Sequence, residues 1–339
     1  MKTIVKRKLF VSLMVCVLFH RCNAQTLTDV SSKLDWKRVT NHKGEEFHPS
    51  FSPDGKYILF DSHDGATYNV MLYDMTNPKH EAVKISAGDH PSWYPNSRQI
   101  LFPSSSIGTV ETFTVNVDGS NKTQLTQGGG FPVSISPDGN SIVYLVRPTD
   151  HWNISIMDID GKQHRRLTNH DSDDFSPEWS RDSQRIMFTS EKNKKTDVMI
   201  MNVNDPKPAR LLSTTGSTSS AKWSPDGRMI LFVSNESGGD QIYTADEGGK
   251  NIQRLTNLAG PKYWVNFTPD GKQIYFVCND DAQAEIYLMD IDGKALKRLT
   301  NNDTREAAPS VSSDGSKITF VSSVDDDLEI FYTHLTVLR

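Results

Sequence analysis

The chain has 339 residues, of which 36% are hydrophobic and 23% are charged, and its formal net charge is -5. This composition is typical of a globular protein with enough apolar residues for a substantial core. The acidic balance argues against binding to nucleic acid or to an anionic membrane surface, because both attract basic proteins.

The first 24 residues differ from the rest of the chain. A basic start is followed by a short apolar run over residues 9–19, and small residues lie near Ala24. This pattern is typical of a secretory signal peptide (residues 1–24), and the apolar run is too short to span a membrane. We therefore expect cleavage near Ala24 and an exported protein, periplasmic or secreted, without a transmembrane segment in the mature chain. Cleavage would remove the five basic residues of this segment, and the net charge would move from -5 to about -10.

The remaining residues repeat one turn motif, Ser-Pro-Asp-Gly or a variant of it, seven times. Proline presets φ, aspartate bonds its own backbone and glycine accepts a positive φ, so we assign these aspartates to the turns rather than to calcium binding. The turns recur every 42 to 44 residues. A fixed period of this length predicts a solenoid or a propeller. The second residue of each motif is Pro53, Pro95, Pro137, Arg181, Pro225, Pro269 and Ser313.

Each repeat contains four short strand patterns. In the first repeat they cover residues 49–52, 56–62, 68–74 and 81–86, where apolar and polar residues alternate between Gly, Asp and Pro. Four-stranded units of this length match the blades of a β-propeller. We therefore predict an all-β fold with one domain over residues 25–339.

The repeat is out of phase with the ends of the chain. A fourth-strand pattern at residues 36–40 precedes the first full unit, and the last unit stops after its third strand, at residues 330–335. We therefore predict a seven-bladed propeller of four-stranded blades, closed by the N-terminal strand completing the last blade. Such closure removes the exposed edges that an open array would leave.

The residue type varies widely at one position of the repeat. This position lies five residues before the second residue of each turn motif. In a propeller this residue starts the innermost strand, near one mouth of the central channel. A packing position would be similar in every unit, so the variation indicates a role at the mouth. In chain order the position holds His48, His90, Pro132, Ser176, Ser220, Trp264 and Ala308.

Loops that meet on a rigid frame form binding sites, so we place a ligand site at this mouth. His48 and His90, from adjacent blades, are candidates for acid/base groups or for ligands of a divalent metal. Two histidines are fewer than the three or four ligands of a usual metal site, so no cofactor is assigned. The candidate ligand-binding residues are His48, His90, Trp152, Asp174, Tyr263, Trp264, Arg305 and Glu306.

Three other features of the repeat have structural explanations. In three consecutive blades, the residue three positions before the second residue of the turn motif is polar, which predicts a polar network along the channel. These residues are Glu178, Lys222 and Asn266. Large apolar residues, including Trp179, stand two residues before it and belong to the core. Cys278 follows a second strand and is expected to be a small buried residue.

The combined pattern Pro-x-Trp-Ser-Pro-Asp-Gly, Ile-x-Phe, Ile-Tyr-x-x-Asp, Asp-Gly and Arg-Leu-Thr is clear in residues 261–300. It resembles the WD40-like propeller repeat of the TolB type (PD40), over essentially the whole mature chain. Seven-bladed oligogalacturonate lyases are similar in their repeats, but their metal-binding Gln-x-x-His-x-His cluster has no match in this sequence.

We therefore interpret the chain as an exported, non-catalytic TolB-like propeller. It is expected to be a monomer that binds an envelope protein, a peptide or a glycan at the channel mouth, and not nucleic acid. The alternative is a carbohydrate-active enzyme, a polysaccharide lyase or hydrolase, with His48 and His90 as acid/base or metal-binding residues.

Overall fold

The computed structural model describes residues 26–41, 44–77, 81–105, 108–280, 283–324 and 327–338. The expected signal peptide, residues 1–24, lies outside these ranges. Within them the regular structure consists of strands and two short 3-10 helices, η1 (Ser31–Lys33) and η2 (Leu335–Leu338). Among the residues that the structure describes, there is no helix that could span a membrane.

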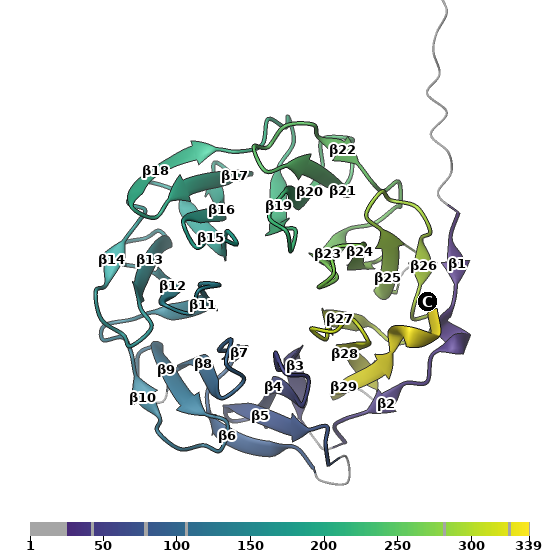
Figure 1. Cartoon of the computed structure of the whole chain (residues 1–339), viewed down its shortest axis with the longest axis horizontal. Coiled ribbons are helices and arrows are strands. Elements are labelled where there is room, and N and C mark those ends of the chain that lie inside the picture. Colours follow the sequence, from purple (N-terminus) through teal and green to yellow (C-terminus); the bar gives the residue numbers. More distant parts are fainter. Residues whose placement is uncertain are drawn as a thin grey trace, which may run out of the picture.

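The strands form a ring of sheets around a central opening, with one edge of each sheet toward the opening (Figure 1). The predicted all-β fold is confirmed. The first half of the ring contains β3 (Glu45–Phe51), β4 (Tyr57–His63), β5 (Tyr68–Asp74), β6 (Val83–Ala87), β7 (Ser92–Trp93), β8 (Gln99–Ser104), β9 (Glu111–Asn116), β10 (Thr123–Gln124), β11 (Phe131–Ile135), β12 (Ser141–Val146), β13 (Asn153–Asp158) and β14 (Arg165–Arg166).

The second half of the ring also contains the two strands that precede β3 in the chain. Its strands are β15 (Asp173–Trp179), β16 (Arg185–Lys192), β17 (Lys195–Asn202), β18 (Asp205–Arg210), β19 (Thr218–Trp223), β20 (Met229–Ser234), β21 (Gln241–Asp246), β22 (Gln253–Arg254), β23 (Lys262–Phe267), β24 (Gln273–Cys278), β25 (Glu285–Asp290), β26 (Lys297–Arg298), β27 (Glu306–Val311), β28 (Lys317–Val324), β29 (Asp327–His334), β1 (Thr28–Asp29) and β2 (Lys37–Arg38).

Consecutive strands pair antiparallel within each sheet. The orders are β10-β9-β8-β7, β11 to β14, β15 to β18 and β19 to β22. Strands β23 to β26 gain β1, which runs parallel to β26 at the outer edge. Strands β27 to β29, β3 to β6 and β2 form one eight-stranded sheet, in which β29 and β3 are joined by a single parallel pair, Leu328 with Glu45. Strand β2 pairs antiparallel with β29, where Arg38 lies opposite Phe331.

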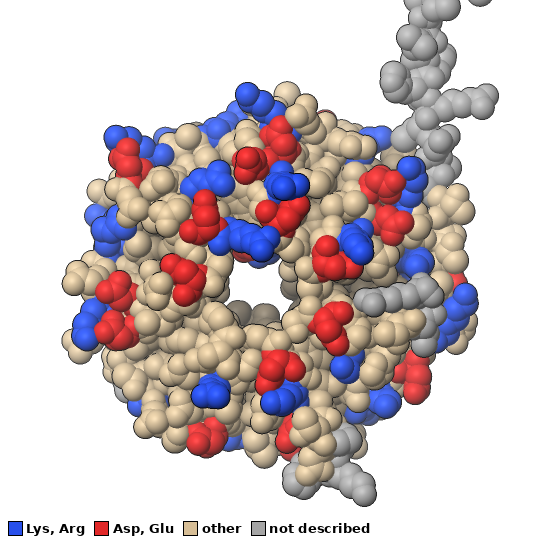
Figure 2. Space-filling model, viewed as in Figure 1, with Lys and Arg blue, Asp and Glu red and all other residues tan. Residues whose placement is uncertain are grey.

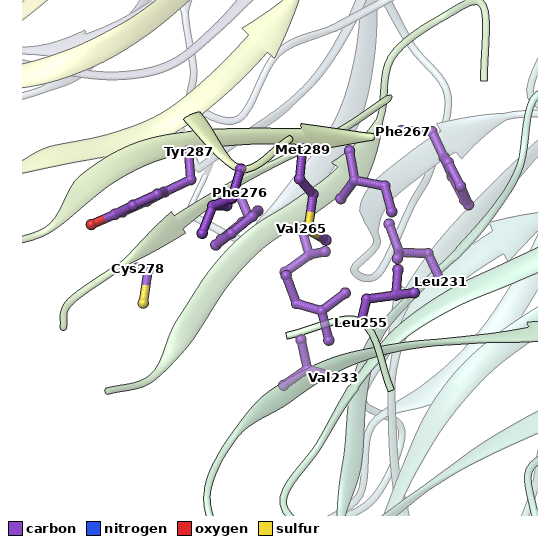
Figure 3. Packing of buried hydrophobic residues seen from close by; sticks show 12 residues of the cluster. Leu231, Val233, Leu255, Val265, Phe267, Phe276, Cys278, Tyr287 and Met289 are labelled. Carbon is purple, nitrogen blue, oxygen red and sulfur yellow. The ribbon is translucent and has the colours of Figure 1, made fainter. Parts of the chain in front are cut away.

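The repeated Ile-x-aromatic pattern forms the cores between sheets. Ile274 and Phe276 of β24 are fully buried, and they pack with Leu231 and Val233 of the neighbouring strand β20 (Figure 3). Each such side chain contributes about 1.5–3 kcal/mol by leaving water. Cys278 is fully buried in the same cluster, as expected.

The turn motifs also join neighbouring sheets. Ser52 Oγ donates to Asp54 Oδ1 within the first turn, at 2.7 Å, so the aspartate serves the turn as predicted. The backbone N–H of Asp54 donates to Ser97 Oγ in the next turn, at 3.0 Å. In the last turn Ser313 Oγ donates to the carbonyl of Pro53, at 2.7 Å, and so joins residues 260 apart in sequence.

Candidate functional site

The variable position of the repeat lies at a β-bulge of the innermost strands. In β3 the register shifts between Phe47 and Ser50, and His48 has a φ of 51°. A bulge redirects the side chain at the mouth, and a positive φ is costly for a residue other than glycine. Pro132 is the exception, because its ring fixes φ near -65°. The equivalent positive φ values are 41° at His90, 48° at Ser176, 53° at Ser220, 48° at Trp264 and 47° at Ala308.

The bulge of β3 and the positive φ of His90, which precedes β7, bring His48 and His90 against each other. Their ring centroids are 4.0 Å apart, with the ring planes tilted by 32°. His48 Nδ1 lies 2.9 Å from Oδ1 of Asp61, a fully buried side chain of β4. His90 Nδ1 lies 3.3 Å from Asp89 Oδ2. The histidine side chains are 40% and 44% exposed, so the cluster opens to solvent above a buried carboxylate.

Acidic neighbours change the affinity of His90 for protons. The hydrogen bond to Asp89 is the largest effect on the pKa of His90 and raises it above its usual value. Burial of the ring opposes this shift, and the charge of Asp61 adds to it. His90 therefore stays protonated to a higher pH than a free imidazole.

A cleft of about 810 Å³ adjoins this cluster. Phe131 lines the cleft, and its ring centroid lies 5.3 Å from that of His90. The guanidinium of Arg147 lies 5.7 Å from the centre of the Trp152 ring. The lining includes Arg165 and Arg166 but no acidic residue of the described chain. The cleft therefore combines aromatic surface with positive charge, which suits a ligand that carries carboxylates.

The remaining predicted site residues fall into two groups. Tyr263 and Trp264 are 47% and 45% exposed on β23, and Arg305 is also exposed, so all three are available to a ligand. Asp174 and Glu306 are instead buried below the surface. The structure corrects the expectation that these two side chains lie open at the mouth, because each has an inward-facing position in the strand segment before the bulge.

Glu306 gives a testable pH dependence. Burial raises the pKa of its carboxyl, although Thr304 Oγ1 donates to Oε1 at 2.8 Å. The folded protein therefore holds a proton that the unfolded chain has released, and stability falls as pH rises from the usual glutamate range through the raised pKa. Glu306→Gln is neutral at every pH. We expect it to gain about 1–3 kcal/mol over the natural protein at pH 8, and nothing at pH 4, in urea unfolding.

Glu81→Gln, at an exposed glutamate, is the matched control and should leave the pH profile unchanged. Parallel profiles for Glu306→Gln and the natural protein would contradict the explanation.

The polar network expected along the channel is present in part. Lys222 Nζ donates to Glu178 Oε2 of the preceding sheet, at 2.7 Å. Asn266 instead accepts from the N–H of Phe267. Both acidic and basic side chains lie around the central opening (Figure 2). This arrangement is consistent with a structural role for the Glu178–Lys222 pair.

The family model of the TolB β-propeller domain matches residues 128–211 and 175–264. The repeats of the chain are TolB-like over these residues. A putative TolB from Agrobacterium tumefaciens has a similar structure, with a TM-score of 0.53 and 20% identity, over 89% of this chain and 97% of that one. This likeness supports the fold and not a particular role.

Two further solved structures resemble the chain with higher TM-scores. An oligogalacturonate lyase in complex with manganese has a TM-score of 0.75 at 15% identity, covering 92% of this chain and 96% of that one. An oligogalacturonate lyase from Vibrio parahaemolyticus has a TM-score of 0.73 at 14% identity, covering 91% and 95%. At these identities the likeness shows the fold alone.

An uncharacterized protein of Agrobacterium fabrum is 26% identical over 152 residues, which are 42% of this chain and 50% of that protein. The TolB-like chain thus spans about half the length of the curated relative that it matches.

Besides Phe131 and the arginines of the cleft, the sequence analysis missed Asp61. It follows the aromatic residue of the second strand, and the other repeats of the TolB-like chain place an uncharged residue there. A comparison of the repeats at this position would have identified it as the one acidic exception. The equivalents are Pro103, Leu145, Thr189, Val233, Val277 and Val321.

Proposed function

We propose that the chain is an exported, seven-bladed TolB-like propeller closed by β2. The pairing of β2 with β29 supports closure, since β2 then supplies the fourth strand beside β27 to β29. The contact between Ser313 and Pro53 supports it as well, because it joins the last turn to the first. Export rests on the signal-like residues 1–24.

We also propose that this propeller is a binding module whose ligand occupies the mouth and the adjoining cleft. The observation that carries the proposal is the cleft itself, which is lined by Trp152, Phe131 and three arginines and by no acidic residue among those that the structure describes. The ligand is a glycan or peptide with carboxylate groups, free or on an envelope protein. Arginine pairs with carboxylates through paired hydrogen bonds, and the indole face offers a stacking surface.

A carbohydrate-active enzyme is the second candidate. A histidine held by a buried carboxylate, as His48 is held by Asp61, is a usual arrangement for a general base. The likeness in fold to oligogalacturonate lyases raises a polysaccharide lyase or hydrolase above other enzyme classes, by analogy of fold alone.

A thermal-shift screen with oligouronides, neutral oligosaccharides and acidic peptides tests the binding proposal. A ligand of the native state raises the melting temperature. For the best ligand, calorimetry should show at least about tenfold weaker binding for Trp152→Ala and for Arg147→Ala, since each removes roughly 1.4 kcal/mol or more. Lys162→Ala, at an exposed residue outside the cleft lining of the same sheet, should bind normally.

Equal weakening by all three variants, or no shift with any ligand, would contradict the binding site. Release of new reducing ends or unsaturated products from a bound uronide would favour the enzyme.

A further inference from the structure

We propose that His48, Asp61 and His90 form a binding site for one divalent transition-metal ion. The inference goes beyond the proposed function, because the ion needs no glycan or peptide in order to bind. One nitrogen from each histidine and one carboxylate oxygen of Asp61 lie within 4.8 Å of one another. Small rotations of two partly exposed imidazoles would bring these atoms around a single ion.

The environment of the Asp61 carboxylate favours a cation as its ligand. Its side chain is fully buried, and Oδ1 receives the contact from His48 Nδ1 at 2.9 Å. Oδ2 is buried and has no hydrogen-bond partner among the described residues. A buried carboxylate oxygen without a partner is costly, and a metal ion would satisfy it. The contact with His48 satisfies Oδ1 of Asp61, but it leaves the buried Oδ2 without a partner among the described residues.

The backbone and the neighbours also fit a metal site. His48 and His90 share the positive φ of the variable repeat position, and from these two positions their ring centroids come within 4.0 Å. Asp89 lies 3.3 Å from Nδ1 of His90 and fixes the orientation of that ring, as outer carboxylates do in metal sites. Phe131 covers the other side of His90.

The set of ligands indicates the class of metal. Two imidazole nitrogens and one carboxylate oxygen suit Zn²⁺, Mn²⁺, Fe²⁺ or Co²⁺, whereas Ca²⁺ and Mg²⁺ prefer oxygen alone. Three protein ligands leave at least one coordination position for a small molecule. That position would lie at the mouth, beside the cleft that is lined by Phe131, a neighbour of His90.

The test is calorimetry of the chelator-treated protein with ZnCl2, MnCl2 or CaCl2 and no other ligand. We expect one equivalent of Zn²⁺ or Mn²⁺ to bind with a Kd of about 1 μM or tighter, and Ca²⁺ not to bind. His48→Gln, His90→Gln and Asp61→Asn should each weaken binding by at least about 100-fold. Co²⁺ absorption gives an independent readout, because the d–d bands of an imidazole-carboxylate site should disappear in the same variants.

His151→Gln is the matched control, because His151 Nδ1 also lies near a carboxylate, 3.6 Å from Asp173. It should bind the ion normally. If Asp61→Asn fails to fold, His48→Gln and His90→Gln still test the metal site, because both substitutions are at partly exposed residues. Absence of stoichiometric binding, or equal binding by the natural protein and both histidine variants, would overturn the metal site. Neither result would affect the cleft tested with Trp152 and Arg147.

Discussion

Deletion of residues 26–41 is expected to lower the melting temperature by about 10 °C or more, which corresponds to roughly 5 kcal/mol or more of unfolding free energy. The deleted segment includes β2, which pairs with β29. It also includes Val30 and Leu34, which are buried against Ile318 and Leu335. Each of these two side chains contributes about 1.5–3 kcal/mol. Thr40 adds hydrogen bonds to β29, where its Oγ1 accepts from the N–H of Ile330 at 2.9 Å.

Circular dichroism during heating measures the effect. Deletion of residues 26–29 alone is the control, because Thr28 and Asp29 of β1 are exposed at the outer edge. It should cost less than about 1 kcal/mol. A synthetic peptide of residues 30–41 should restore much of the lost stability by adding the strand back. An unshifted melting temperature after the longer deletion would contradict closure by β2.

The period of the repeat predicted the ring because alternation of apolar residues sets which faces are buried. Ile274 and Phe276 were recognisable as core from sequence for this reason, and both are fully buried. The innermost strands were harder. The first was predicted at residues 49–52, but β3 covers Glu45–Phe51, because a bulge at His48 lets the pairing continue past the irregular position.

The same bulge explains the error at two predicted site residues. An extra residue in a strand reverses the alternation beyond it, so positions before and after the bulge cannot be assigned to one face by counting. Glu306 precedes the bulge in β27, where the register shifts between Ala307 and Ser310. Asp174 has the same place in β15. Both side chains were expected at the mouth, and both are buried.

The Arg-Leu-Thr motif was recognised only as the end of a strand, and the structure assigns it a further role. Arg298 Nη2 donates to Oε1 of Glu285 at 3.1 Å, and Arg298 Nε donates to the carbonyl of Thr300 at 3.0 Å. Thr300 Oγ1 accepts from the N–H of Ile286 at 2.9 Å. The motif thus fastens the outer strand to an acidic residue at the start of the third strand. The acid lies 13 residues before the arginine, too far for a local pattern to reveal.

Arg298→Met is therefore expected to cost about 3–5 kcal/mol, because it leaves the fully buried carboxylate of Glu285 without its ion-pair partner. The Arg298 side chain is only 11% exposed, so water does not replace the lost contact. Arg210→Met is the matched control. Arg210 pairs with Asp197 in the same way, at 2.8 Å, but it is 42% exposed. Its loss should cost about 1 kcal/mol or less.

The double variant Glu285→Met/Arg298→Met separates the ion pair from packing. Removing both charges takes away the uncompensated carboxylate, so urea unfolding should show most of the stability restored. A double variant as unstable as Arg298→Met would mean that the long arginine side chain acts by packing. Equal losses for Arg298→Met and Arg210→Met would mean that burial does not set the strength of this contact. We therefore expect the repeated motif to stabilise the ring most where its acid is fully buried, which is the case at Glu285 and at Glu329, the partner of Arg38 in the strand that we propose closes the ring.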